Sequence, residues 1–377
     1  MGERKEITRR SFLNLVGASS AGIAGMSVLG LPGFNQLFAQ AVKDVPVLWL
    51  PAGSCTGCSV SLLNSLSPTI QDLLLGEVLP GAHVSLQFHP TVMAGQGQQA
   101  IDVLDQYKEA EPGSFVLVME GGLSTKDGGV YCEIGEHNGH GIPLKQHFDE
   151  LAPKAMAVIN MGTCSSYGGI PAAPPNPTGI QPVGEYMKAA GMNTPYVNVP
   201  GCPPHPDWFV GTVATVLLGG LDMLKVDEHG RPLAFYGKLM HDNCEFRGNF
   251  DKGMFAQNFG DKACLYKLGC KGPVTHADCP RRRWNSGVNW CIGSGSPCIG
   301  CVEPNFPYKM DMYEVVHIHE QTAPDAYPLV GGEKGGGVDP VTTGIVGGVA
   351  GAAIGVGIAS SRAKKKAATA DSEPKEG

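Results

Sequence analysis

Cys55 and Cys58 are the residues of this chain whose types and spacing most clearly predict chemistry. The two thiols stand three residues apart on a glycine-bearing turn, and the apolar run 45–50 before them is typical of a buried strand. Two thiolates at this spacing can bind one metal centre. The turn also leaves backbone N–H groups free to point at bound sulfur, so the sequence predicts a metal-binding loop here.

Two further cysteines lie in similar surroundings later in the chain. Cys164 follows the apolar run 155–160, and Cys202 follows the run 196–199. If the three runs are neighbouring parallel strands, the four thiolates converge where the strands end. An all-cysteine site of this kind suits an iron–sulfur cluster.

A histidine and three cysteines form a second candidate group. His241 and Cys244 stand three residues apart, and Cys264 and Cys270 could complete the site. A lone histidine is more often structural than a ligand, but its spacing to Cys244 favours a role in metal binding.

Four more cysteines form a third candidate group. Cys298 and Cys301 repeat the C-x-x-C spacing, with Cys279 and Cys291 upstream. Zinc accepts four cysteines, or three with one histidine, so the spacing alone does not separate zinc from iron–sulfur. Three such sites in one chain favour iron–sulfur clusters, because electron transfer benefits from a row of redox centres and stability does not.

Strands that alternate with helices are expected to position the first group. Residues 83–88 and 114–119 are predicted to be strands, and residues 144–151 and 207–217 helices. With the three runs before the cysteines, this alternation predicts an α/β fold with a doubly wound parallel sheet. Regular periodicity fades after residues 226–232, and we place a domain boundary there.

Composition narrows the class of protein. The chain has 377 residues, of which 42% are hydrophobic and 17% charged, so a packed core and two domains are possible. The formal net charge of −7 argues against nucleic acid as a general partner. Seven of the 12 cysteines crowd into residues 233–325, and that segment is expected to be ordered by metal clusters more than by a large core.

The N-terminus predicts export. Arg9 and Arg10 form a twin-arginine pattern before a Gly/Ala-rich segment, and small residues at 39–41 offer a cleavage site. Residues 1–41 are therefore predicted to be a removable twin-arginine signal, with an ordinary amphipathic helix as the alternative. Exported cysteines are often paired in disulfides. The C-x-x-C spacings, and an export route that carries proteins already loaded with cofactor, weigh against that interpretation.

The C-terminus predicts a membrane anchor. A glycine-rich linker is expected over residues 329–340, and the 20 residues from Val341 to Ser360 carry no charge. We expect a transmembrane helix over residues 341–361, followed by a basic cytoplasmic tail over residues 362–377. The alternative is a glycine-rich disordered tail.

Six motifs together resemble the small subunit of periplasmic nickel–iron hydrogenases, and most of all its nickel–iron–selenium branch. They are Cys55-Thr56-Gly57-Cys58, residues 162–169 around Cys164, residues 200–204 around Cys202, His241-x-x-Cys244, residues 268–273 around Cys270, and Cys298-Ile299-Gly300-Cys301. The resemblance covers essentially the whole chain. It implies a flavodoxin-like domain over residues 42–228 and a small irregular iron–sulfur domain over residues 229–328.

The resemblance also implies a ligand set for each of three clusters. The proximal 4Fe–4S cluster would be held by Cys55, Cys58, Cys164 and Cys202, the distal 4Fe–4S cluster by His241, Cys244, Cys264 and Cys270, and the medial cluster by Cys279, Cys291, Cys298 and Cys301. Many members have a proline where Cys291 stands and hold a 3Fe–4S medial cluster. The thiol here favours 4Fe–4S, with an unliganded Cys291 beside 3Fe–4S as the alternative.

The implied function is electron transfer in a membrane-bound uptake hydrogenase on the periplasmic side. A large subunit with the nickel–iron centre would split H2, and no catalytic residue is expected on this chain. Electrons would leave to a membrane cytochrome b or quinone-linked subunit, or to a periplasmic cytochrome c. The extra cysteines of oxygen-tolerant relatives are missing, so oxygen sensitivity is expected. Two alternatives stay open: the iron–sulfur subunit of a quinone-reducing respiratory complex, and a non-redox exported protein held by disulfides or zinc.

Overall fold

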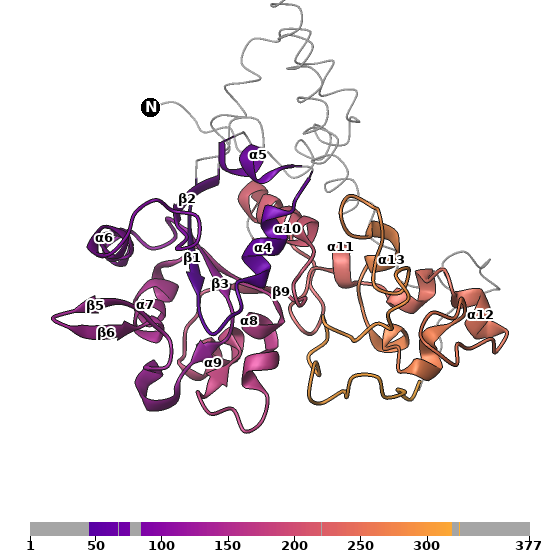
Figure 1. Cartoon of the computed structure of the whole chain (residues 1–377). Coiled ribbons are helices and arrows are strands. Elements are labelled where there is room, and N and C mark those ends of the chain that lie inside the picture. The colour runs from indigo at the N-terminus through magenta and orange to yellow at the C-terminus, as the bar shows by residue number, and fades with distance from the viewer. Residues whose placement is uncertain (1–44, 67, 76–83, 220, 319–323, 325–377) are drawn as a thin grey trace, which may run out of the picture.

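A computed structural model of the chain describes residues 45–66, 68–75, 84–219, 221–318 and 324 (Figure 1). The predicted signal, the linker over residues 329–340 and the tail over residues 362–377 lie outside these residues. The described chain has two parts, which we call the sheet unit (residues 45–223) and the cysteine-rich unit (residues 233–318), joined by a connecting loop (residues 224–232).

A five-stranded parallel sheet forms the centre of the sheet unit. Its strands are β1 (Val45–Pro51), β2 (Val84–Phe88), β3 (Val116–Glu120), β7 (Ala157–Met161) and β9 (Tyr196–Val199). They lie in the order β2-β1-β3-β7-β9, and every neighbouring pair is parallel. This is the 2-1-3-4-5 order of flavodoxin-like folds, in which ligands bind beyond the carboxyl ends of the strands. The predicted parallel α/β sheet is confirmed.

Helices cover both faces of this sheet (Figure 1). They are α4 (Gly57–Leu63), α5 (Ile70–Leu75), α6 (Gln98–Lys108), α7 (Leu144–Leu151), α8 (Thr163–Tyr167), α9 (Val183–Ala189) and α10 (Pro206–Gly219). Side chains alternate along β1: Val47 and Trp49 join the apolar cluster under α4 and α10, whereas Leu48 and Leu50 join the cluster under α6, α7 and α9. The strands are apolar on both faces because both faces are buried.

The sheet unit also contains short strands and 3-10 turns outside the central sheet. The two-residue strands β4 (Leu123–Ser124) and β8 (Ile180–Gln181) pair antiparallel, and β5 (Glu133–His137) forms a hairpin with β6 (His140–Pro143). Short 3-10 turns are η1 (Lys126–Gly129), η2 (Ala152–Lys154), η3 (Ile170–Ala172) and η4 (Leu221–Met223). The hairpin projects from the body of the unit (Figure 1).

The cysteine-rich unit has little regular structure. Its elements are α11 (Leu233–Tyr236), η5 (Met240–Asn243), α12 (Arg247–Asp251), η6 (Leu265–Leu268), η7 (Gly272–Val274) and α13 (Cys279–Arg282). Its own apolar cluster is small and includes two cysteines, Cys270 and Cys298. The unit packs beside α10 (Figure 1), where Trp208 Nε1 donates a hydrogen bond of 2.7 Å to Asp278.

The predicted fold class needs one correction, because it includes a C-terminal transmembrane helix. Among the helices in the part of the chain that the structure describes, none is both long and apolar enough to cross a bilayer. Residues 341–361, where the sequence predicts that helix, lie outside the described residues. The fold is therefore stated without it, as an α/β unit with a parallel sheet followed by an irregular cysteine-rich unit.

Candidate metal centres

The first four predicted ligands gather beyond the carboxyl ends of the sheet strands. Cys55 and Cys58 follow β1, Cys164 follows β7 and Cys202 follows β9. Burial raises the pKa of the Cys58 thiol, and the negative charges of Glu120 and of the other three cysteines raise it further. The four thiols therefore lie within electrostatic reach of one another. The three strands are not all neighbours, because β3 runs between β1 and β7.

Glu120, the last residue of β3, anchors the first turn of α4, which carries Cys58. Its side chain is fully buried, and its Oε1 accepts hydrogen bonds of 3.1 Å from the backbone N–H groups of Cys58 and Ser59. Its Oε2 accepts a 2.8 Å bond from Trp49 Nε1 and another from the Ser59 hydroxyl. A carboxylate that accepts four hydrogen bonds holds the backbone at the start of α4 firmly in position. The sequence signal for it is an acidic residue directly after the apolar run 114–119.

Glycines let the backbone approach the sulfur atoms of this group. Gly162 has φ +92° and ψ 158°, a conformation essentially restricted to glycine, and a Cβ there would stand 2.5 Å from Cys58 Sγ. Gly169 has φ +53°, and a Cβ there would stand 3.0 Å from Cys164 Sγ. The chain therefore keeps space beside these sulfurs that a side chain would fill, as a site for a bulky inorganic group requires.

Gly162→Ala is expected to destabilise the protein by about 1–3 kcal/mol, because alanine strains the backbone at this φ and ψ. It should also lower the iron content, because the new methyl group displaces Cys58 Sγ. Thermal unfolding and iron analysis check both effects. Gly191→Ala is the control, since Gly191 has φ +69° but open space around its Cβ position. Equal iron content in the two variants would contradict this interpretation of Gly162.

The second group of predicted ligands lines one small apolar cavity. His241, Cys244, Cys264 and Cys270 all face it, with Leu265 and Ile292 among the apolar lining. Within the described residues, the buried Nε2 of His241 has no hydrogen-bond partner. Burial and the nearby Arg247 charge lower the pKa of His241 to about 4, so the imidazole is neutral at pH 7. A neutral imidazole with an unpaired buried nitrogen is what metal ligation needs.

The third group centres on Cys279, Cys298 and Cys301. Burial raises the pKa of Cys279 well above its usual value, and the charges of Cys301, Asp278 and Cys291 add to the rise. Burial raises the pKa of Cys301 to about 12, and Cys291 again contributes. Cys291 is exposed at the surface but lies within electrostatic reach of this group. The Cys291 thiol therefore lies within electrostatic reach of Cys279 and Cys301, and also of Cys270 in the second group.

Backbone N–H groups point at the sulfur atoms in the cysteine-rich unit. The N–H of Gly272 donates to Cys270 Sγ at 3.4 Å, and that of Gly300 donates to Cys298 Sγ at 3.3 Å. In both cases the donor is two residues after the cysteine. Such bonds stabilise negative charge on sulfur and tune iron–sulfur clusters.

The three groups follow one another through the molecule. Thr163, next to Cys164 of the first group, donates a hydrogen bond from its Oγ1 to the Cys301 carbonyl of the third group. The Lys271 N–H, next to Cys270 of the second group, donates one of 2.8 Å to the Cys298 carbonyl of the third. The third group therefore lies between the other two. All 12 cysteines are free thiols, which argues against a disulfide framework. Cys132 stands apart from the groups and packs against the apolar cluster under α7.

Among the described residues, no three or more His, Cys, Asp or Glu side chains are gathered closely enough to hold a single metal ion. The thiols of an iron–sulfur cubane stand farther apart than the ligands of one zinc ion, because each binds a different iron atom. Three features fit iron–sulfur clusters. They are the wide spacing of the ligand side chains within each group, the space beside the sulfurs, and the unpaired imidazole nitrogen.

Two family models match the chain. The NADH ubiquinone oxidoreductase 20 Kd subunit matches residues 55–216, and the C-terminal model of the NiFe/NiFeSe hydrogenase small subunit matches residues 236–314. The periplasmic [NiFeSe] hydrogenase small subunit of Desulfomicrobium baculatum is 42% identical over 80% of this chain and 96% of that protein. The chain belongs to the NiFe/NiFeSe hydrogenase small subunits. The predicted resemblance to these small subunits is confirmed.

Other relatives of this small subunit agree. The quinone-reactive Ni/Fe-hydrogenase small chain of Wolinella succinogenes is 40% identical over 83% of this chain and 85% of that protein. The solved [NiFeSe] hydrogenase of Desulfovibrio vulgaris Hildenborough has a TM-score of 0.68 and 46% identity, covering 72% of this chain and 98% of that one. The family model that corresponds to the respiratory alternative matches within the sheet unit. The cysteine-rich unit matches the hydrogenase model.

The family settles the general role of the chain. It is an electron-transfer small subunit of a nickel–iron hydrogenase, and hence part of a hydrogenase enzyme. Hydrogenase small subunits carry iron–sulfur clusters and pair with a large subunit.

Proposed function

We propose that this small subunit holds three iron–sulfur clusters in a row and carries electrons away from the H2-splitting centre of its large subunit. The observation that most supports this proposal is the order of the three cysteine groups. The Cys301 carbonyl accepts a hydrogen bond from Thr163, next to Cys164, and the Cys298 carbonyl accepts one from Lys271, next to Cys270. When bound, the clusters would accept and release electrons one at a time.

Each group has four ligand residues in this proposal. The first group would hold a proximal 4Fe–4S cluster and the second a distal 4Fe–4S cluster. Because the Cys291 thiol lies within reach of Cys279 and Cys301, the third group would hold a medial 4Fe–4S cluster rather than 3Fe–4S.

The chain's own contribution is to exclude water and to fix the sulfur atoms. Cys264, Cys270 and Cys298 are buried, and backbone N–H groups donate to the sulfurs of the last two. Burial and such hydrogen bonds are the means by which a protein sets cluster potentials. The neutral His241 marks the distal end, where electrons would leave.

We propose that the large subunit docks over α4, beside the first group. Cys55 is exposed there, and Val60, Leu63 and Leu66 expose 52%, 45% and 59% of their surface. A hollow next to α4 is lined by Pro203, Trp284 and neighbouring residues. Clustered apolar side chains on a surface indicate a protein interface.

Val60→Asp is expected to weaken assembly with the large subunit at least about tenfold, because the interface would bury an unpaired charge. Co-purification from a tagged large subunit, measured over a concentration series, checks the effect. Val315→Asp is the matched control, since Val315 is 49% exposed but lies near the second group, where Tyr266 donates to the carbonyl of Val316. Equal assembly of both variants would argue against docking over α4.

The names of the relatives support a more specific role for this small subunit. They include periplasmic, quinone-reactive and uptake hydrogenase small subunits. We therefore propose H2 uptake on the periplasmic side after twin-arginine export, with electrons passed to a quinone-linked subunit or a cytochrome.

The complex of both subunits provides the test. Its visible absorption band should bleach under H2 and recover when an artificial one-electron acceptor is added. Iron and nickel should be present, and selenium analysis would show which branch the large subunit belongs to. A colourless complex, or one that contains zinc in place of iron, would refute the proposal.

A further inference from the structure

The loop that carries Cys301 is held against the sheet unit by a buried hydroxyl. Thr163 is 1% exposed, and its Oγ1 accepts a 2.9 Å hydrogen bond from the Gly201 N–H while it donates to the Cys301 carbonyl. Thr163 directly precedes Cys164, and Gly201 directly precedes Cys202. One hydroxyl therefore connects three chain segments, two from the first cysteine group and one from the third.

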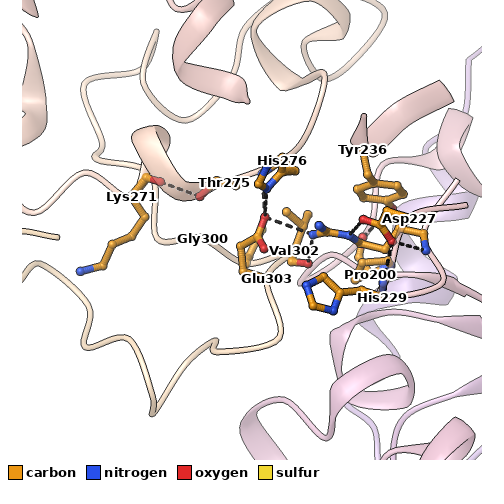
Figure 2. Close-up of polar contacts among 12 residues, drawn as sticks. Pro200, Asp227, His229, Tyr236, Lys271, Thr275, His276, Gly300, Val302 and Glu303 are labelled. Atoms are coloured by element: carbon orange, nitrogen blue, oxygen red, sulfur yellow. Dashed lines mark hydrogen bonds and ion pairs between the residues drawn. The ribbon is translucent and has the colours of Figure 1, made fainter. Parts of the chain in front are cut away.

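A buried arginine, Arg231, holds the same loop from another side; Figure 2 labels its partners Asp227, Val302 and Glu303. Arg231 is 2% exposed, and its Nε donates to Asp227 at 2.7 Å. Its Nη1 donates to Glu303 Oε1 at 3.1 Å and to the Val302 carbonyl at 3.2 Å. Asp227 and Arg231 belong to the connecting loop, whereas Val302 and Glu303 directly follow Cys301.

The connecting loop is itself fixed to the sheet. The Asn198 N–H donates to the Gly230 carbonyl at 2.9 Å, and the Asn198 side chain donates to the His229 carbonyl at 2.8 Å. Since Asn198 belongs to β9, Arg231 is held in place by the strand that leads to Cys202. On the far side, Glu303 Oε1 also accepts a 2.6 Å bond from the His276 N–H, as Figure 2 shows.

A buried ion pair is weak evidence for stability, because desolvation offsets the attraction between the charges. Arg231 has carboxylates on both sides, and its planar fork fixes the direction of each bond. Such an arrangement specifies geometry more than it adds stability. The geometry that it specifies is the approach of the Cys301 loop to the Cys202 loop.

We propose that Thr163 and Arg231 are positioning residues for electron transfer between the proximal and medial groups, because they hold the Cys301 loop against the Cys202 loop. The inference rests on the proposed function. In the step concerned, one electron leaves the proximal group, which is oxidised, and enters the medial group, which is reduced. No bond forms or breaks, and H2 at the large subunit is the reductant.

Thr163→Val tests the hydroxyl, because valine keeps the shape of threonine and removes both hydrogen bonds. In the intact two-subunit complex we expect full iron content, but proximal-to-medial electron transfer that is about tenfold slower. Rapid freezing after H2 addition, followed by spin-resonance spectroscopy, measures how long electrons stay on the proximal cluster. Thr163→Ser keeps the hydroxyl and should restore the rate.

Arg231→Lys removes the planar guanidinium group but keeps the positive charge. It provides a second test if the Thr163→Val variant does not fold. We expect the same slower step, and amide hydrogen exchange at His276 at least about tenfold faster because charge-assisted bonds are lost. Arg247→Lys is the matched control: Arg247 is also buried between two carboxylates, those of Asp242 and Asp251, but beside the distal group. It should leave the proximal-to-medial rate unchanged.

The outcomes separate this inference from the proposed function. If the unmodified complex shows no distinct proximal and medial signals, both fail. If it shows both signals, but Thr163→Val and Arg231→Lys alter only thermal stability and leave the transfer rate unchanged, the inference alone is overturned. A rate that Thr163→Ser restores and Thr163→Val does not supports it.

Discussion

Replacing Cys202 by alanine is expected to abolish H2-driven electron transfer and to remove about four of about twelve iron atoms from the complex, since each cubane holds four. Cys202 follows β9 and belongs to the first group, next to the face over which we propose that the large subunit docks. Gly201, directly before Cys202, is linked to the Cys301 carbonyl through the Thr163 hydroxyl. The loss of Cys202 would therefore remove the entry point of the relay and its link to the next group.

Iron and nickel analysis of the purified complex, together with H2-dependent dye reduction, measures this effect. Cys132→Ala is the control, because Cys132 is a half-buried cysteine that packs in the apolar cluster under α7 and away from the three groups. It should keep the full iron content and activity. Full activity in Cys202→Ala, or equal iron loss in both variants, would contradict the ligand assignment.

Replacing Cys291 by proline is expected to convert the medial cluster from a four-iron to a three-iron form. Cys291 is exposed, so the change opens no buried cavity, and the other three thiols of its group remain. Without a fourth ligand, one iron atom is held by sulfide alone and is readily lost. The complex should lose about one iron atom and gain the spin-resonance signal of an oxidised three-iron cluster.

The potential of the medial cluster should rise in the same variant, which a redox titration measures. Cys291→Ser is the control, because its hydroxyl retains an oxygen ligand at the same position and should preserve four irons. An unchanged spectrum of the oxidised Cys291→Pro complex would show that Cys291 is not a ligand.

The sheet and its cysteine loops could be predicted from the sequence because their signals are local. The apolar runs 45–50 and 196–199 correspond to β1 and β9 within a residue or two, and residues 144–151 coincide with α7. Strand order is a long-range property that periodicity does not encode. The position of β3 between β1 and β7, and with it the role of Glu120, therefore appears only in the folded chain.

The residues that hold the ligand loops together could not be predicted for the same reason. Thr163 contacts Cys301 across 138 positions of sequence, and Arg231 contacts Glu303 across 72. Nothing in the local sequence around either residue indicates those partners. The prediction of a transmembrane helix rests on length and lack of charge alone, and no helix in the described part of the chain supports it.

A redox titration of the two-subunit complex, followed by spin resonance and combined with an iron count, tests the central claim most directly. The account predicts three separately reducible centres and about twelve iron atoms per complex. Fewer than three centres, or cysteines that prove to be joined as disulfides, would contradict it.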